Sequence, residues 1–305
     1  FLKEDIMQPN SYRTCYCKDV SREMLDHEVT ISGWVETIRD HGGVLFLDLR
    51  DTTEVVQVVS NDDTIFAHLT KESVIRVKGL IRLRSEETYN PHIKTGEVEL
   101  FVQELDVLSE AQSILPFEIR RSEKSNEDIR LKYRYLDLRN DKVKQKLKMR
   151  HELLHFLRNK MYDLGFMEVQ TPILTASSPE GARDFVVPSR NFKGKFYALP
   201  QAPQIYKELL MVGGVEKYFQ IAPCFRDEDA RKDRTLEFYQ LDYEMSYVTE
   251  EDVLQVGEEI FYDTFKKFSD KEVSSRPFKR LTYQEAMSKY GTDKPDLRNP
   301  LVITD

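Results

Sequence analysis

The chain has 305 residues, a net charge of −8, and is 40% hydrophobic and 32% charged. This length suffices for two domains with separate cores, and the acidic balance argues against a general nucleic-acid coat protein. No run approaches the roughly 18–20 apolar residues of a membrane helix. The N-terminal sequence lacks a signal-peptide core, so we expect a cytoplasmic protein without a membrane partner. Three cysteines lack zinc-site spacing and are expected to be reduced structural thiols: Cys15, Cys17 and Cys224.

Residues 1–115 are predicted to form an all-β barrel of the OB type. Apolar and polar residues alternate, as in strands, over 29–35, 44–49, 55–59, 74–83 and 97–108. Five short strands without a long helix fit a small closed barrel. Phe46 lies opposite the leucines of its strand, and Gln57 lies on the next strand. A ring and an amide together suit a single-stranded base, although Phe46 taken alone fits ordinary barrel packing better.

Residues 116–145 are predicted to be a basic hinge. Leu115-Pro116-Phe117 ends the barrel, and residues 118–150 contain twelve Lys and Arg against six Asp and Glu. A local basic stretch in an acidic protein can steer a polyanion to one place. From charge alone, a solvated helix face is the simpler interpretation.

Residues 146–305 are predicted to be an α+β domain with an antiparallel sheet. Apolar residues recur at helical spacing from Asp141, and Gly165 stops this helix. Residues 166–172 are typical of a strand that Pro172 ends. Two further helices are expected over 203–212 and 250–268, and Gln204 and Lys207 share one stripe of the first.

The segment 219–245 is predicted to be a β-hairpin with two unlike faces, because side chains alternate along a strand. One face is apolar and carries Phe219, Ile221, Pro223, Phe225, Tyr239, Leu241, Tyr243 and Met245. The other face carries Arg226, Glu228, Asp242 and the ring of Phe238. A row of salt bridges on the protein surface would explain the charged residues of this face, but it would not explain why the Phe238 ring lies among them. The sequence therefore predicts a binding surface, and side chains must hold any nucleotide because no GxxxxGK[ST] loop is present.

Several segments resemble class II aminoacyl-tRNA synthetases. Residues 225–228 and 234–238 resemble motif 2, and residues 164–172 resemble motif 1, which builds the dimer interface of that family. The barrel is similar to the anticodon-binding OB-fold of the aspartate, asparagine and lysine subgroup. Four further segments resemble bacterial-type aspartyl-tRNA synthetases: 132–139, 178–184, 194–201 and 290–298.

The resemblance implies an enzyme that activates L-aspartate with ATP and Mg²⁺ and transfers it to tRNA(Asp), with no metal ligands assigned in this chain. It implies a homodimer formed through Gly165–Pro172. Arg226 would be catalytic, on the α-phosphate and the aspartate carboxylate. The implied ATP-binding residues are Arg226, Asp227, Glu228, Thr235 and Phe238. The implied aspartate-binding residues are Glu180, Gln204, Lys207, Arg226 and Asp242. The implied anticodon-binding residues are His41, Phe46 and Gln57.

Some features differ from the family pattern. The chain stops at Asp305, before motif 3, so we expect an incomplete catalytic domain that ends at the start of the bacterial insertion domain. Such a chain should bind the anticodon but activate aspartate poorly or not at all. Thr235 and Val59 stand where relatives often carry a glutamine and an aromatic residue. We hypothesise that His41 relaxes discrimination between the aspartate and asparagine anticodons, so that tRNA(Asn) is also charged; a loop histidine without consequence is an equally good explanation.

Two other functions remain open at this point. A lysine- or asparagine-specific relative would share the barrel and motifs 1 and 2, although residues 178–184 and 290–298 argue against it. The other alternative is a non-catalytic tRNA-binding module, and without motif 3 we expect this chain by itself to behave as one. An amino-acid activation panel separates the first from the aspartate enzyme.

Overall fold

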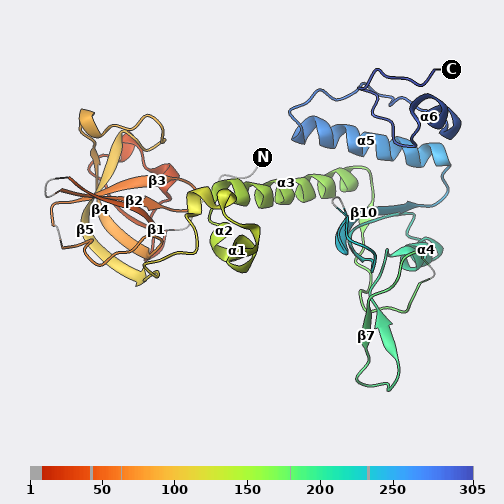
Figure 1. The fold of residues 1–305 in the computed structure, drawn as a ribbon, viewed down its shortest axis with the longest axis horizontal. Helices are drawn as coiled ribbons and strands as arrows, with labels where there is room; N and C mark the ends of the chain where they lie inside the picture. The colour runs from red at the N-terminus through yellow and green to blue at the C-terminus, as the bar shows by residue number, and fades with distance from the viewer. Residues whose placement is uncertain (1–8, 42–43, 63, 179, 232–233, 305) are drawn as a thin grey trace. The chain divides into compact units, whose positions relative to one another are not determined.

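The structure is a computed structural model, and it describes residues 9–41, 44–62, 64–178, 180–231 and 234–304, with the side chain of His41 left out. The chain divides into two compact units, residues 1–137 and 138–305, which are described separately. Both are drawn in Figure 1. Among the described residues, no helix is long and apolar enough to cross a membrane.

The first unit contains the predicted five-stranded closed barrel. Its strands are β1 (Glu28–His41), β2 (Val44–Arg50), β3 (Val55–Ser60), β4 (Val74–Leu83) and β5 (Val98–Ser109). Their order is β1-β2-β3-β5-β4, and β3 and β5 pair in parallel. Three short 3-10 helices lie between or before them: η1 (Cys17–Asp19), η2 (Arg22–Met24) and η3 (Glu86–Thr88).

Strand β1 is longer than the sequence pattern predicted. Its first half pairs with β4 and its second half with β2, and the register shifts between Val35 and Thr37. A bulge of this kind bends a strand so that it can serve two neighbours. The polar residues after Val35 hid this continuation, because they break the alternation that marks a half-buried strand.

The interior of the barrel is apolar, as predicted. Leu47 and Leu49 are fully buried, together with Ile31, Val35 and Leu100. Gly79 lets β4 and β5 approach closely, since a Cβ atom there would lie only 2.0 Å from the carbonyl oxygen of Phe101. Any larger residue at this position should therefore open the barrel wall.

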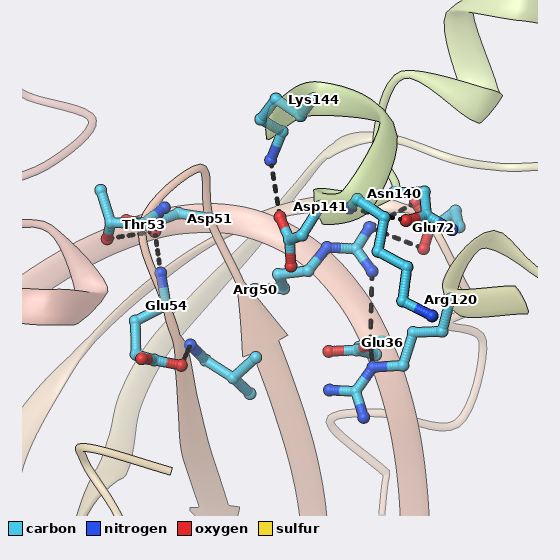
Figure 2. Close-up of polar contacts among 12 residues, drawn as sticks. Glu36, Arg50, Asp51, Thr53, Glu54, Glu72, Arg120, Asn140, Asp141 and Lys144 are labelled. Carbon is cyan, nitrogen blue, oxygen red and sulfur yellow. Dashed lines mark hydrogen bonds and ion pairs between the residues drawn. The ribbon is translucent and has the colours of Figure 1, made fainter. Parts of the chain in front are cut away.

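A buried ionic cluster joins residues of β1, β2 and the segment before β4 (Figure 2). Nη2 of Arg50 donates to both carboxylate oxygens of Glu72, at 2.8 and 2.9 Å, and Nη1 lies 3.4 Å from Oε1 of Glu36. Arg120, from η4 (Ile119–Lys124), also pairs with Glu36. Buried charges are stable only when they are paired in this way. The segment that follows the barrel is therefore fixed to the barrel wall at Arg120.

The rest of the predicted hinge within this unit is also structured. Helices α1 (Glu127–Lys132) and α2 (Arg134–Asp137) surround Asp137, which is fully buried. Asp137 accepts from Ser122 Oγ at 2.6 Å and from Arg130 Nε at 3.1 Å, and pairs with Arg134. Burial acts to raise the pKa of Asp137, but these partners outweigh it and hold the pKa below its usual value. Part of the basic excess thus neutralises a buried carboxylate.

The described part of the second unit has helices on both sides of a central hairpin, which is formed by β9 and β10. In chain order its elements are α3 (Asp141–Asp163), β6 (Met167–Glu168), β7 (Val186–Pro188), β8 (Phe196–Ala198), α4 (Gln204–Val212), β9 (Lys217–Phe225), β10 (Glu237–Met245), α5 (Glu250–Phe268) and α6 (Tyr283–Tyr290). The three predicted helices are confirmed as α3, α4 and α5. Gly165 follows α3 with a φ of +81°, a left-handed conformation that favours glycine and ends a helix.

The larger sheet of the second unit contains the predicted antiparallel hairpin and one additional parallel strand, and β7 and β8 form a separate antiparallel pair. Strands β9 and β10 are antiparallel, with Asp242 opposite Gln220, whereas β6 pairs with β9 in parallel. The predicted strand over 166–172 was too long, since β6 contains only two residues. The ladder ends after the amide of Val169 donates to Phe219, and Pro172 offers no donor to continue it.

The apolar face of the hairpin forms the core of this unit. Phe219, Leu241, Tyr243 and Met245 pack with residues of α3 and α5 that include Met161 and Ile260. Tyr239 is the exception on this face, because it is 51% exposed. The guanidinium of Arg150, from α3, covers its ring at 4.8 Å from the centroid. The opposite face of β9 and β10 is thereby left for the candidate site.

Candidate active site

The second face of the hairpin gathers polar side chains in two adjacent rows. The register sets Cys224 opposite Phe238, Ala222 opposite Gln240, Gln220 opposite Asp242, and Tyr218 opposite Glu244. The predicted division of the two faces is thus confirmed. Because small and polar residues of β9 lie opposite the ring and carboxylates of β10, this surface can hold a ligand with a ring at one end and charged groups at the other.

Lys207 and two carboxylates mark the charged end. Nζ of Lys207, from α4, lies 3.0 Å from Oδ1 of Asp242 and 3.1 Å from Oε2 of Glu244. The side chains of Lys207 and Asp242 are only 12% and 11% exposed. An ion pair this buried is costly unless its remaining polar atoms are also satisfied.

Two oxygens of this cluster lack a hydrogen bond of good geometry. Oδ2 of Asp242 and Oε1 of Glu180 are buried without such a bond from any described residue. The Tyr218 hydroxyl is close enough to the Asp242 carboxyl to lower its pKa, but it donates its proton to Oε1 of Gln220 at 2.8 Å. Buried acceptors without a donor are rare in folded proteins and call for an explanation. A ligand with an ammonium group would supply three donors to such acceptors.

The electrostatics of the carboxylates fit this interpretation. Burial raises the pKa of Asp242, against the lowering effect of Lys207. Burial also raises the pKa of Glu180, against the lowering effects of Arg226 and Lys207. For Lys207, burial acts to lower the pKa, but Asp242 and Glu244 outweigh it and the pKa lies above its ordinary value. Burial thus outweighs the nearby cations at both carboxyls, and a further bound cation would lower their pKa values.

The Phe238 end of this surface is a cavity beside Arg226. The Arg226 guanidinium carbon lies 5.1 Å from the centroid of the Phe238 ring. The cavity has a volume of about 340 Å³, and it is lined by Arg226, Glu228, Asp229, Ala230, Arg234, Thr235, Leu236, Phe238 and Gln240. Four of the five predicted ATP-binding residues thus share one cavity. The exception is Asp227, which lines a neighbouring cavity of about 510 Å³ with Gly181, Ala182 and Arg183.

The structure does not bring Gln204 into the charged cluster. Its Nε2 donates to Oε1 of Glu208, one turn along the same helix, at 2.7 Å. The stripe that Gln204 and Lys207 share is present, but only Lys207 contacts Asp242. The role implied for Gln204 stays a prediction.

Gln201 lies beside the loop of Glu180, and the sequence analysis gave it no role. It is only 2% exposed and hydrogen-bonds to Ala182 and Asp184. A glutamine is seldom buried so completely. Its position directly before Ala202-Pro203 and α4 was visible in the sequence, but its burial was not.

A second polar surface lies on the barrel, where Phe46 is half-buried and lies on the face opposite the leucines. Gln57, opposite Asp48 in the ladder, is only 4% exposed, so it is less accessible than we expected. Its Nε2 donates to Oε2 of Glu99 at 2.8 Å. Burial raises the pKa of Glu99, against the lowering effects of Gln57 and Arg84.

Glu99 and Arg84 were missed from sequence because they follow Gln57 by 42 and 27 positions, and only barrel closure unites them. The parallel pairing of β3 with β5 brings Glu99 to Gln57. Nη2 of Arg84 is buried without a hydrogen-bond partner among the described residues. The side chain of His41, the third predicted anticodon residue, lies outside the described part of the chain; its backbone pairs with Val44 in the β1–β2 ladder.

Within the described residues, no group of three or more His, Cys, Asp and Glu side chains is arranged to hold a metal ion. The cysteines Cys15, Cys17 and Cys224 are buried and not disulfide-bonded. The described protein groups therefore do not form a metal site of their own.

Comparison with protein families identifies the second unit. The sequence profile of "tRNA synthetases class II (D, K and N)" matches residues 126–304, which is more than half of the chain. The chain belongs to this family. A profile of the "OB-fold nucleic acid binding domain" matches residues 29–108 of the same synthetase chain, over the barrel. The two-part fold and the resemblance predicted from sequence are both confirmed.

Individual relatives of this synthetase chain are also aminoacyl-tRNA synthetases. It is 53% identical, over 97% of its length, to an "Aspartate--tRNA(Asp/Asn) ligase" of Wolbachia pipientis subsp. Culex pipiens, and 54% identical, again over 97%, to one of Anaplasma phagocytophilum. It covers 52% and 50% of those proteins, and so spans about half the length of the curated relatives it matches. Among solved structures, asparaginyl-tRNA synthetase from Pyrococcus horikoshii complexed with asparaginyl-adenylate has a TM-score of 0.75 at 27% identity. That match covers 90% of this chain and 65% of the other.

Proposed function

We propose that this chain carries the first half of an aspartate–tRNA ligase, which activates L-aspartate with ATP and transfers it to tRNA(Asp) and tRNA(Asn). The observation that carries the proposal is the buried cluster of Lys207, Asp242 and Glu180 beside the Arg226 cavity. It supplies one cation and two unsatisfied carboxylate oxygens, the complement of an aspartate side chain and an ammonium group. The names of the Wolbachia and Anaplasma relatives support the choice of aspartate and of both tRNAs.

In the proposed reaction, an α-carboxylate oxygen of aspartate attacks the α-phosphorus of ATP, and pyrophosphate leaves. The 3′-terminal hydroxyl of the tRNA then attacks the carbonyl carbon of the adenylate, and AMP leaves. Arg226 would bind the α-phosphate and the attacking carboxylate, Phe238 would stack on adenine, and Glu228 would accept from its amino group. Catalysis would rest on positioning and charge stabilisation, without a protein acid or base.

Lys207 would determine the preference for aspartate. A desolvated side-chain carboxylate needs a cation with hydrogen bonds, and Lys207 is held in place by Asp242 and Glu244. The side-chain amide of asparagine would turn either its uncharged oxygen or its NH₂ group towards the Lys207 ammonium. The oxygen binds a cation more weakly than a carboxylate does, and the NH₂ group is a donor that cannot bind another donor. The free energy difference between the two ligands should therefore come mainly from this one contact.

Mg²⁺ would accompany ATP as its phosphate-bound cation. Mg²⁺ in such sites is held mainly by phosphate and water, with one or two carboxylates. Such binding does not need a group of three or more protein ligands, and the described residues contain no such group. No step of the proposed reaction depends on a protein ligand to this ion.

The assembly is also part of the proposal: a cytoplasmic homodimer paired through residues 165–172. Two observations support the homodimer, and a third supports the compartment. Strand β6 is the edge strand of its sheet, and Met167 is 58% exposed there. An unpaired edge with an exposed apolar residue is a template for association. The cysteines, buried and not disulfide-bonded, fit a reducing compartment.

The first test is amino-acid activation. The 305-residue chain should show little ATP–pyrophosphate exchange by itself, whereas a chimaera with the second half of the Wolbachia ligase should exchange with aspartate. Asparagine and lysine should give rates lower by about 100-fold or more, because each leaves a buried charge of the cluster unpaired. A chimaera that prefers asparagine or lysine, or an equally active isolated chain, would contradict the proposal.

The second test concerns the barrel. Phe46→Ala should weaken binding of both tRNA(Asp) and tRNA(Asn) to the 305-residue chain by about 1–3 kcal/mol, since one base loses its stacking partner. Filter binding at fixed salt measures the two affinities. Phe192→Ala is a matched control, because Phe192 is a 58% exposed phenylalanine of the other unit. Equal effects of both substitutions would show that Phe46 does not contact the anticodon.

A further inference from the structure

We propose that Gln201 is a positioning residue that fixes the loop carrying Glu180 over the amino-acid site, through hydrogen bonds that only a carboxamide can make. Its effect on aspartate rests on the proposed function, whereas its effect on the loop does not. Gln201 itself reaches neither Asp242 nor Lys207 by any hydrogen bond that the described structure contains. It would act through the backbone of residues 182–184.

The carboxamide of Gln201 uses both of its ends on one short segment. Its Oε1 accepts from the amide of Ala182 at 3.1 Å, and its Nε2 donates to the carbonyl of Ala182 at 2.9 Å. The same Nε2 donates to Oδ1 of Asp184 at 2.5 Å. The side chain therefore pairs with Ala182 as a neighbouring strand would, and its second donor binds a carboxylate.

The loop has a second attachment, on the ATP side of the site. The amide of Asp227 donates to the carbonyl of Arg183 at 3.0 Å, and these residues form an isolated antiparallel bridge. Asp184 also accepts from Ser177 Oγ at 2.5 Å. Residues 182–184 are thus held between Gln201, three residues before α4, and Asp227, directly after Arg226.

This attachment matters because Glu180 is only two residues from Ala182. Glu180 contributes one of the two buried, unsatisfied oxygens of the charged cluster. Gly181 separates it from Ala182, and a Cβ at Gly181 would meet nothing within 4 Å, so side-chain packing does not fix this link. The position of the Glu180 carboxylate relative to Asp242 therefore depends on the hydrogen bonds at residues 182–184.

The isosteric change Gln201→Glu tests this role. It replaces the Nε2 donor by an acceptor, so the bonds to the Ala182 carbonyl and to Asp184 are lost and two carboxylates meet. The Ala182 amide keeps an acceptor in this variant, so the informative amide is that of Asp227, which donates to the Arg183 carbonyl. In the 305-residue chain, hydrogen exchange at the Asp227 amide should become at least about tenfold faster, as expected when about 1.4 kcal/mol or more of hydrogen bonding is lost. In the Wolbachia chimaera, KM for aspartate should rise about tenfold, with kcat and KM for ATP changed less than about threefold.

The rescue is a carboxamide–carboxylate exchange, Gln201→Glu with Asp184→Asn. The carboxamide introduced by Asp184→Asn could donate to the new carboxylate and still accept from Ser177, so KM for aspartate should recover at least about threefold. Gln255→Glu is the control for charge, since Gln255 lies on α5 and its Nε2 contacts Glu251 at 3.4 Å. It should leave exchange and kinetics unchanged. Thermal unfolding shows that each variant is folded.

The outcomes separate the two proposals. Unchanged exchange at Asp227 in folded Gln201→Glu would overturn the positioning role, whatever the chain does with aspartate. Faster exchange with an unchanged KM for aspartate, or no rescue by the double variant, would also overturn it. An unsubstituted chimaera that fails to activate aspartate would instead refute the proposed function, while the exchange result at Asp227 would still decide whether Gln201 holds the loop.

Discussion

Lys207→Met should lower the free energy of unfolding of this chain by about 3–5 kcal/mol near neutral pH, the cost of breaking a buried ion pair. The substitution leaves the Asp242 carboxylate 11% exposed and without its cation, and removes the 3.1 Å contact with Glu244. Methionine fills a similar volume, so loss of packing contributes little. Urea unfolding monitored by circular dichroism measures the difference.

The deficit should depend on pH in one direction. The folded-state pKa of Asp242 is already raised by burial, and without Lys207 it should rise further. A carboxyl with a raised pKa contributes stability below its unfolded value and loses it as pH rises through the folded value. The difference between Lys207→Met and the unsubstituted chain should therefore be largest at about pH 8 and shrink towards about pH 5.

Lys207→Arg is the matched control, because it keeps the charge and should keep most of the stability while still impairing the fit to aspartate. The double variant Lys207→Met/Asp242→Asn should regain part of the lost free energy, since the uncompensated carboxylate is gone. A folding free energy that Lys207→Met leaves unchanged at every pH would show that the cluster is solvated, and that its unsatisfied oxygens do not call for a ligand.

Much of this architecture follows from local patterns. The five strands of the barrel and the two faces of the 217–245 hairpin were predictable, because both depend on the two-residue period of a strand and the buried side is strongly apolar. Helix α5 begins and ends as predicted, and α4 ends as predicted but begins one residue later, at Gln204. Lys207 and Asp242 were assigned to the same site by resemblance, and their 3.0 Å contact agrees with it.

Features that arise from contacts between distant segments were not predictable. The parallel pairing of β6 with β9 and the burial of Gln57 beside Glu99 both depend on which strands become neighbours. Gln201 shows the same limit, since its three hydrogen bonds join positions 17 to 19 residues apart. A pattern read along one strand contains no information on a partner that tertiary structure selects.

Arg226→Ala should lower aspartate-dependent ATP–pyrophosphate exchange of the Wolbachia chimaera by about 100- to 1,000-fold, the usual effect of removing a preorganised charge from a reacting centre. The fold should survive, because the 2.9 Å bond from the Arg226 amide to the Leu236 carbonyl belongs to the backbone. The contact with the Phe238 ring is worth only about 0.5–1 kcal/mol at such a site. Arg226→Lys should lose less, since it keeps the charge but not the planar two-pronged donor.

Arg150 provides a control on the other side of the same strand. Its guanidinium lies 4.8 Å from the Tyr239 ring, much as that of Arg226 lies 5.1 Å from the Phe238 ring, and the two aromatic residues are adjacent on β10. Successive side chains of a strand point to opposite faces, so Arg150→Ala removes a similar cation–ring pair away from the site. Exchange should then change by less than about threefold, within the usual effect of surface substitutions. If both arginines mattered equally, the function of Arg226 would be to stabilise the hairpin, and the phosphate would have to be bound elsewhere.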